Sequence, residues 1–460
     1  MASRAKAGEL LRRPGTRALG WSAVAFIVVT GLWWVHLFNQ FGIDDWIERV
    51  FFAYASPSVG IGQYRDVVLI GIDERSTPTL GAYGENVSGN AAWRAHHAAL
   101  VDRLTAAGAV ALAFDAYFPA VGSAHKEATE RFAAAITAAR ASGQLQVVIG
   151  YTRRYATDPL LAGVATDAGT GLVDVARTTG NLFGKAYVGR ILMAEMTVTP
   201  TGAGDQQRLL YPLPMPLAIY LASLRAEKGA ERVTFDPFSR ELRIEWPKEA
   251  KVIQVEVESC AIDEVGCAPD GEPDFAGAQR VYRAVLPFWI RGSTSFRKDS
   301  YSNLAGDVDL APDFAGRIVI VGAETADEVL PLGPGSPDDT AYGYRVIARV
   351  VADLLADRYL RRPGSGLQIS VFVLLVAIGF LARLRLPFRE IAVELPLLGK
   401  RRLPLGFFVV TAVAVFIALW VFRREYLVFD LTYGILALAL GYFAVPKLSG
   451  LITDHPEAKQ

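Results

Sequence analysis

Four acidic side chains stand directly after runs of apolar residues that predict buried strands. They are Asp73 with Glu74, Asp115 and Glu324, and Arg291 ends another predicted strand. In an open α/β sheet, ligands bind in the crevice outside the carboxyl ends of the strands. A group of acids with an arginine at this edge could bind a cationic or polar solute. We therefore take these five residues as candidate ligand-binding or switch residues.

The same acids also have a purely structural interpretation. An Asp at a strand end can cap the next helix, or it can pair with Arg75 or Arg94 to hold a loop. Arg94 therefore joins the candidate set. If ligand binding is the role, Asp115→Asn should reduce signalling without unfolding the domain. A large drop in melting temperature would favour the structural interpretation instead.

Other patterns that could carry chemistry are weak. His97 lies on the apolar side of a predicted helix, four residues after Trp93, which favours a core or boundary histidine over a metal ligand. Gly60-Ile61-Gly62 precedes a strand and lacks the third glycine of a dinucleotide loop. The sequence has no phosphate-loop, nucleophile-elbow or zinc-protease motif. We expect a protein that is not an enzyme and that uses no metal or cofactor.

The chain has two cysteines, Cys260 and Cys267. In an oxidising compartment a pair this close in sequence is a disulfide candidate that would close a hairpin or a loop. Two unrelated free thiols are the alternative. A metal site needs more ligands than this neighbourhood offers.

The predicted elements that position these residues alternate between strands and helices. Short apolar runs predict buried strands, and longer segments with apolar residues three or four apart predict helices. The pattern gives strands at 66–73, 109–115, 146–151 and 317–323, and helices at 93–107 and 123–141. Strands that are joined through helices imply a mainly parallel sheet covered by helices.

The middle of this region has a different pattern. Residues 200–216 are rich in loop formers, and residues 216–228 predict a helix. Residues 232–258 alternate between apolar and polar side chains, as antiparallel strands do. Residues 281–290 return to the character of a core strand. We therefore expect one α/β domain with a β-rich insertion.

Four strongly apolar runs have about the length that a bilayer requires, roughly 18–20 residues each. Basic residues gather before the first run and between the second and third, so the positive-inside rule places both segments in the cytoplasm. Lys plus Arg and Asp plus Glu number 47 each, which argues against a nucleic-acid binder. The predicted order is a cytoplasmic tail (1–18), transmembrane helix 1 (19–38), an extracytoplasmic domain (39–366), transmembrane helix 2 (367–384), a cytoplasmic basic loop (385–404), transmembrane helices 3 and 4 (405–422 and 427–445) and a short cytoplasmic tail (446–460).

One stretch joins the predicted domain to the membrane. The strand at 317–323 leads through a loop rich in Gly, Pro and Asp to a helix that begins near Tyr344 and ends before Arg361, Arg362 and Pro363. The second apolar run follows at once. A shift at the strand end can therefore reach the membrane through one helix, and the Arg361-Arg362-Pro363 junction is the predicted signal exit.

Several segments, taken in order, resemble the type-two CHASE domain, an extracytoplasmic sensory module of bacterial signalling proteins. They are Val68 to Ser76, Leu80-Gly81, Trp93-Arg94 to Leu104, Ala106 to Ala109, Phe114-Asp115, Phe118, Phe288 to Gly292, Phe296, Tyr301-Ser302, Gly316 to Ala323 and Tyr359 to Pro363. The resemblance implies one transmembrane helix before the domain and three after it, which is also the arrangement that hydropathy predicts. Family members usually continue into a cytoplasmic cyclase or kinase, whereas only residues 446–460 follow the last predicted span here.

The resulting hypothesis is a sensor or signalling adaptor of the bacterial inner membrane. It detects an unknown stimulus, such as a small ligand, and passes the signal through its transmembrane helices to a separate cytoplasmic signalling enzyme. A homodimer is compatible with this scheme. The alternative is a structural or docking subunit of an envelope complex, and a periplasmic hydrolase with an unrecognised site is a third hypothesis.

Overall fold

The chain divides into two compact units, each described separately below. One unit is Ser58–Leu360, and the other combines Met1–Pro57 with Arg361–Gln460. The computed structural model describes residues 14–35, 37, 64–80, 87–152, 156–164, 170–172, 176–182, 185–201, 204–226, 230–236, 241–261, 280–287, 296–304, 310–325, 328–331, 340–359, 361–385, 390–395 and 399–443.

The unit Ser58–Leu360 contains a seven-stranded sheet in which every pairing is parallel. Its strands, in spatial order, are β13 (Arg297–Ser300), β1 (Val67–Ile72), β14 (Ile318–Ala323), β2 (Ala111–Tyr117), β3 (Gln146–Tyr151), β4 (Thr170–Leu172) and β8 (Leu213–Pro214). All six residues of β1 and of β14 are buried. Continuous apolar runs suit strands that are covered on both faces. The predicted α/β fold with a mainly parallel sheet is confirmed.

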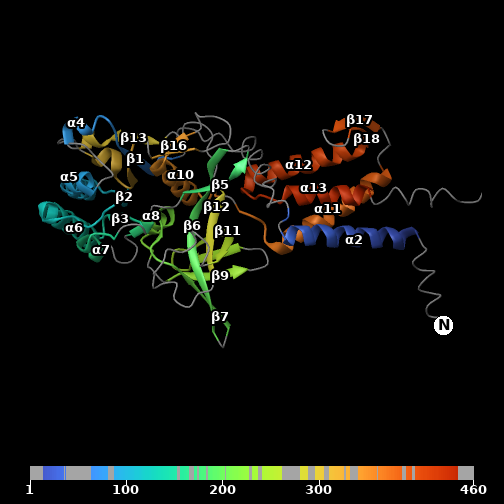
Figure 1. Ribbon diagram of the computed structural model, residues 1–460, viewed down its shortest axis with the longest axis horizontal. Coiled ribbons are helices and arrows are strands. Elements are labelled where there is room, and N and C mark those ends of the chain that lie inside the picture. Colours follow the sequence, from blue (N-terminus) through green and yellow to red (C-terminus); the bar gives the residue numbers. More distant parts are fainter. Residues whose placement is uncertain are drawn as a thin grey trace, which may run out of the picture. The chain divides into compact units, whose positions relative to one another are not determined.

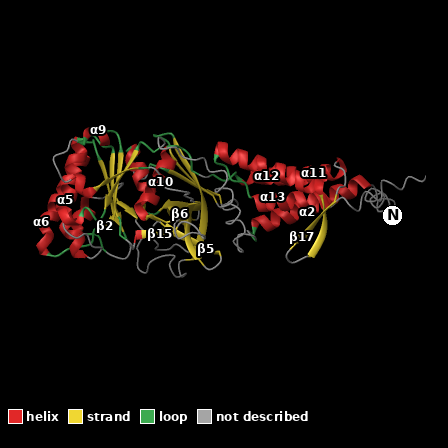
Figure 2. Cartoon of the chain, turned by 90° about the horizontal axis from the view of Figure 1, so that it is seen from above, coloured by secondary structure: helices red, strands yellow, loops and turns green. Residues whose placement is uncertain are grey.

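Helices cover the two faces of this sheet (Figure 2). On one face lie α5 (Val87–Ala106), α6 (Lys126–Ala141), α7 (Pro159–Val164) and α9 (Ala311–Phe314), and on the other lie α8 (Met215–Leu224) and α10 (Gly343–Leu355). Successive strand residues point to opposite faces, so Val68 and Ile70 pack toward α5 while Val67 and Leu69 pack toward α10. Each fully buried side chain of this kind stabilises the fold by about 1.5–3 kcal/mol.

Three short elements complete the sheet edge and its connections. The helix α4 (Thr77–Leu80) follows β1, and a 3₁₀ turn, η2 (Ser123–His125), precedes α6. A second 3₁₀ turn, η5 (Tyr301–Leu304), directly follows β13. Between β14 and α10 the chain forms a small antiparallel pair, β15 (Val329–Pro331) with β16 (Thr340–Tyr342).

A second sheet is antiparallel and is larger than the sequence predicts. Its strands are β5 (Ala176–Leu182), β6 (Lys185–Thr201), β7 (Gly204–Leu209), β9 (Arg232–Asp236), β10 (Glu241–Trp246), β11 (Lys251–Ala261) and β12 (Arg280–Pro287). Figure 1 shows β6, β12 and β11 running side by side. The prediction for residues 200–216 was wrong, because much of this segment forms β7, β8 and the start of α8. The strand near 281–290 belongs to this second sheet, not to the parallel one.

The described residues of the other unit form four helices and one hairpin. The helices are α2 (Pro14–Trp34), α11 (Ser365–Arg385), α12 (Leu405–Glu425) and α13 (Leu431–Phe443), and the hairpin is β17 (Glu390–Leu395) with β18 (Gly399–Pro404). By length and composition, two helices can cross a membrane, α11 and α12. Among the described residues, α13 has 13 residues and the apolar part of α2 is Ser22–Trp34, so both are shorter apolar helices. The described residues thus contain two helices that are both long and apolar enough to span a membrane, where the sequence predicts four.

Glycines bring α11 and α13 into contact along their backbones. A Cβ atom added to Gly441 would lie 2.2 Å from the carbonyl oxygen of Val376, and one added to Gly379 would lie 2.3 Å from that of Leu438. Real Cβ atoms essentially never approach other atoms so closely. A glycine is therefore required at both positions for this packing, which is a common feature of helix pairs in membranes.

Candidate functional site

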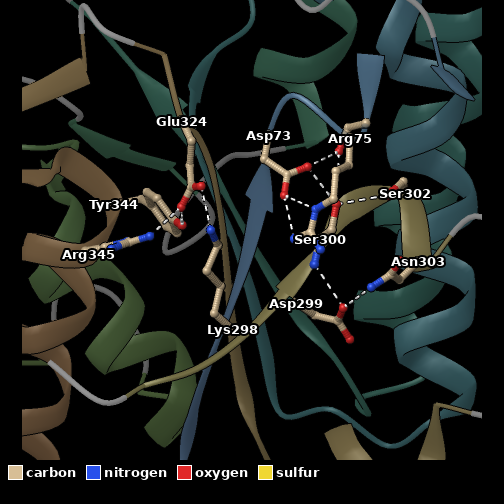
Figure 3. A network of polar contacts seen from close by, with 11 residues as sticks. Asp73, Arg75, Lys298, Asp299, Ser300, Ser302, Asn303, Glu324, Tyr344 and Arg345 are labelled. Atoms are coloured by element: carbon tan, nitrogen blue, oxygen red, sulfur yellow. Dashed lines mark hydrogen bonds and ion pairs between the residues drawn. The ribbon is translucent and has the colours of Figure 1, made fainter. Parts of the chain in front are cut away.

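Polar side chains gather at the carboxyl edge of the parallel sheet, where β13, β1 and β14 end next to one another. Figure 3 shows two neighbouring clusters at this edge. One is centred on Asp73, after β1, and the other on Glu324, after β14. Both acids therefore lie at the same edge of the sheet, as the sequence predicts. Each is surrounded by its own set of hydrogen-bond donors.

Asp73 accepts hydrogen bonds from three neighbouring side chains. Arg75 donates from Nε at 3.0 Å and from Nη2 at 2.8 Å, and the hydroxyls of Ser300 and Ser76 donate at 2.7 and 3.1 Å. Burial opposes the ionisation of Asp73, but the hydrogen bonds from Ser300, Arg75 and Ser76 outweigh it and lower its pKa to about 2. Asp73 is thus an ionised carboxylate that holds the end of β1 against the end of β13.

Glu324 also has three donors, and two of them are cations. Lys298 Nζ lies 2.5 Å from one carboxylate oxygen, Arg345 Nη2 lies 2.7 Å from the other, and the Tyr344 hydroxyl donates to that same second oxygen. Burial opposes its ionisation, but these three partners outweigh burial and lower the pKa of Glu324. Burial and the nearby Glu324 carboxylate raise the pKa of Tyr344, so its hydroxyl stays protonated and can donate.

Two paired glycines make room for this second cluster. Gly71 of β1 and Gly322 of β14 lie opposite each other in the sheet. A Cβ atom on Gly322 would lie 2.4 Å from Cβ and Cγ of Tyr344, and one on Gly71 would lie 3.1 Å from Glu324 Cδ and Lys298 Cε. The absent side chains therefore leave the space in which the ring of Tyr344 and the Lys298–Glu324 pair lie on the sheet.

Asp115 lies inside β2 and not after it, because the strand continues to Tyr117. In register it pairs with Gly322. Its carboxylate and that of Glu328 each lie 3.5 Å from where a Cβ atom of Gly343, the first residue of α10, would be. Asp115 thus lies beside the start of α10, near the Glu324 cluster. Glu74 is exposed to solvent.

Arg94 does not join the carboxyl-edge clusters. It projects from α5 and is fully buried, where its Nη1 forms an ion pair with Asp158 at 3.0 Å and donates to Thr129 Oγ1 at 2.7 Å. Its Nη2 donates to the carbonyl oxygen of Pro119 at 2.5 Å. Burial lowers the pKa of Arg94, against the effect of Asp158. These contacts match the alternative in which the arginine holds neighbouring segments together.

Several predicted residues cannot be placed in a site. Arg291 and Cys267 lie outside the described residues, and Cys260 is described only as part of the backbone of β11. The disulfide therefore stays a prediction. Among the described residues, no group of three or more His, Cys, Asp or Glu side chains is placed to hold a metal ion.

His97 is a core residue, as the helix pattern predicts. It is buried among the rings of Phe114, Phe118 and Phe132, and its Nδ1 lies 2.8 Å from the Tyr301 hydroxyl. Burial, followed by the charges of His96 and Arg94, lowers the pKa of His97 to about 3.

The predicted signal exit is tied to residues near α13. The backbone of Arg361 forms hydrogen bonds with Tyr426 and Val428 in an isolated bridge. Arg362 Nη1 lies 2.6 Å from Asp430, whose carboxylate also accepts a hydrogen bond from the indole of Trp33. Pro363 is buried.

Five partners in the carboxyl-edge clusters were missed from the sequence: Ser76, Lys298, Ser300, Tyr344 and Arg345. Lys298 and Ser300 belong to β13, whose sequence Arg-Lys-Asp-Ser carries no apolar pattern. Tyr344 and Arg345 are in the first turn of α10. The only signal for them is the pair of glycines at matching places near the ends of two apolar runs, which indicates that other side chains approach the sheet there.

These features define a class of protein, an α/β domain with a polar carboxyl edge in a chain that also has apolar helices of membrane-spanning length. A family model described as the CHASE2 domain matches residues 23–383. The chain therefore belongs to the CHASE2 domain family, which is an extracellular, sensory and non-catalytic domain family. No curated protein sequence and no solved structure matches the chain significantly.

Proposed function

We propose that this protein is a membrane-anchored extracytoplasmic sensor that passes its signal to a separate cytoplasmic protein. The observation that carries the proposal is the CHASE2 match over residues 23–383, since that family senses signals outside the cell. The matched residues run from the first apolar helix to the end of α11, so they include both the domain and the membrane segments on either side of it.

The proposed topology has four transmembrane helices in the bacterial inner membrane, with both termini in the cytoplasm. The helices α11 and α12 are long and apolar enough to span, and α2 and α13 are apolar helices that pack with α11 through a shared cluster of buried side chains. Basic residues before α2 and between α11 and α12 support a cytoplasmic location for both segments. Residues 39–366 are then extracytoplasmic.

The proposed signal path begins at the carboxyl edge of the parallel sheet. Glu324 ties the end of β14 to Lys298 of β13 and to Tyr344 and Arg345 of α10. The chain continues from α10 through Arg361 and Arg362 into α11. A change in the partners of Glu324 would therefore move the first turn of α10, which is covalently continuous with the membrane segment.

The test is purification of the full-length protein in mild detergent, followed by mass spectrometry of the proteins that co-purify. Under the proposal a cytoplasmic kinase, cyclase or other signalling enzyme is recovered. The matched control is Arg297→Gln, which breaks an exposed ion pair with Asp313 outside the proposed signal path and should recover the same proteins as the wild type. Recovery of an envelope assembly without a signalling enzyme would replace the sensor by a structural or docking subunit.

The topology has its own test with alkaline phosphatase fusions, because this enzyme is active only outside the cytoplasm. A fusion after Gly366 should be active, and fusions after Arg402 and after Gln460 should be inactive. Activity of the fusion after Gln460 would contradict the four-helix arrangement.

A further inference from the structure

The acids at the strand ends suggest a negatively charged carboxyl edge, but at the Glu324 cluster the exposed side chains are cations. The carboxylate of Glu324 is covered, with 8% of its side chain exposed, whereas the side chains of Lys298 and Arg345 are each 31% exposed. The surface of this cluster is therefore cationic, and the acid lies beneath it. Two cations against one carboxylate leave one positive charge that the cluster itself does not neutralise.

The cluster already recognises a carboxylate. A lysine, an arginine and a tyrosine hydroxyl converge on the two oxygens of Glu324 from three different elements (Figure 3). Donors of these types form the short, charge-assisted hydrogen bonds that proteins use to bind carboxylates. Arg345 also has a spare donor, because its Nε is buried and has no acceptor among the described residues.

The neighbouring groups restrict the total charge of a ligand. Asp115 and Glu328 place two carboxylates beside Gly343, two residues before Arg345. Asp299, next to Lys298 in β13, points to the opposite face of the sheet, where it accepts a hydrogen bond from Asn303. A ligand with one negative charge can be neutralised by Lys298 and Arg345, whereas a dianion would be repelled by the surrounding acids.

From this arrangement we infer that the carboxyl edge binds a small organic monocarboxylate, which competes with Glu324 for Lys298, Arg345 and Tyr344. The inference rests on the proposed sensory function and names the ligand class of its site. The free carboxylate replaces an intramolecular one, so Glu324 acts as a built-in competitor. Once displaced, Glu324 no longer ties β14 to the first turn of α10, and this is the structural change that the ligand produces.

Competition makes a prediction that a purely structural role does not make. Glu324→Gln removes the charged competitor, so it should bind propionate about tenfold more tightly than the wild type, since an intramolecular group acts at a high effective concentration. Lys298→Gln should bind propionate about tenfold or more weakly, because it loses a charge-assisted hydrogen bond. If Glu324 served only to hold the fold, its removal would not tighten binding.

The experiment titrates the full-length protein in detergent with sodium propionate at constant ionic strength and follows its melting temperature. A ligand that binds only the folded state stabilises it by RT ln(1 + [L]/Kd), so the melting temperature rises further at a given propionate concentration when binding is tighter. The matched control is Arg297→Gln, which alters the residue before Lys298 in β13 and breaks an exposed pair with Asp313. Its propionate binding should equal that of the wild type.

Inorganic phosphate serves as the contrasting probe, because it carries more negative charge. Stronger stabilisation of Glu324→Gln than of the wild type by propionate supports the inference, and weaker stabilisation of Lys298→Gln supports it further. If Lys298→Gln fails to fold, the Glu324→Gln result alone decides. Equal binding of propionate by wild type and Glu324→Gln overturns it, as does tighter binding of phosphate than of propionate. The co-purification experiment contains no propionate, so it tests the proposed sensory function independently of the proposed ligand.

Discussion

Two ion pairs of the α/β unit show how strongly burial controls the role of a charged residue. Arg94 and Asp158 pair in the interior, and Asp158 also accepts a hydrogen bond from the amide of Leu160 at the start of α7. Arg297 and Asp313 pair at the surface, where both side chains are more than 40% exposed. Solvent screens the exposed pair, whereas the buried pair leaves an uncompensated charge when one partner is removed.

The first prediction concerns this buried pair. Arg94→Met should lower the free energy of unfolding by about 3–5 kcal/mol, because Asp158 is left in the interior without its cation. Denaturant unfolding of the full-length protein measures this change. Arg297→Gln is the control and should leave the unfolding midpoint almost unchanged. Equal effects of the two substitutions would mean that the Arg94 pair is not buried in solution.

His97 gives a prediction about pH. Its pKa is about 3 in the folded protein, against about 6.5 for an unperturbed histidine, because burial disfavours the charged ring. Between these two values the unfolded chain binds a proton that the folded protein does not bind, so stability decreases as the pH falls from about 6.5 toward 3. In His97→Gln this part of the pH dependence should disappear. The slope of the melting temperature against pH measures the contribution of His97. The absolute melting temperature does not, because the substitution also removes the Tyr301 contact and so shifts stability at every pH. A slope equal to that of the wild type would contradict the assignment.

At the residue scale, the sequence predicts the central acids of the site and the pairing of Asp73 with Arg75, but not the other partners. Asp73 and Glu324 are recognisable because each directly follows an apolar run, and finding the end of a predicted strand requires only the residues next to it in the sequence. Lys298 and Ser300 come from a strand without any apolar pattern, and it pairs with β1 more than 220 positions earlier in the chain. Asp158, the partner of Arg94, is likewise identified only once α5 and the start of α7 are brought together.

At the scale of elements, apolar periodicity succeeds where a strand or helix buries a complete face. The strands β1, β2, β3 and β14 are predicted nearly to their boundaries, since each is covered by helices on both sides. The strands β4 and β8 are too short to show a period. The hairpin β17–β18 lies in the segment expected to be a basic loop. The strand β17 has apolar residues at every second position over only six residues, and β18 is mostly basic and shows no alternation.

The pairing of α11 with α13 gives a prediction at this scale. Gly441→Val and Gly379→Val each place side-chain atoms against a backbone carbonyl of the partner helix, which cannot rotate away. Both variants should therefore separate the two helices and lower the melting temperature in detergent. Gly434→Ala is the matched control in α13, because its added Cβ would meet the flexible Leu375 side chain at 3.1 Å. A larger effect of Gly434→Ala than of Gly441→Val would contradict the backbone contact.

For the whole molecule, the decisive feature is the division of the chain just before Arg361. Arg361 and Arg362 are held by Tyr426, Val428 and Asp430, all within the unit that contains the apolar helices. The preceding helix α10 is packed in the core of the other unit. Under the proposed function, the signal must cross the short segment between α10 and Arg361, because it is a covalent link between the sensory sheet and α11.

Insertion of two glycines immediately before Arg361 tests this coupling. It should abolish signalling to the co-purifying cytoplasmic enzyme, because flexible residues no longer transmit a displacement of α10. Both units should remain folded, since the insertion spares the Arg361 bridge and the Arg362–Asp430 pair as well as the core around α10. The control is the same insertion after Gly143, a residue of positive φ in an open turn after α6. Hydrogen exchange of the full-length protein checks that the parallel sheet and α11 stay protected in both variants. If the insertion before Arg361 leaves the output unchanged while both units stay folded, the signal does not travel through α10, and the role of the carboxyl edge as the origin of the signal is lost with it.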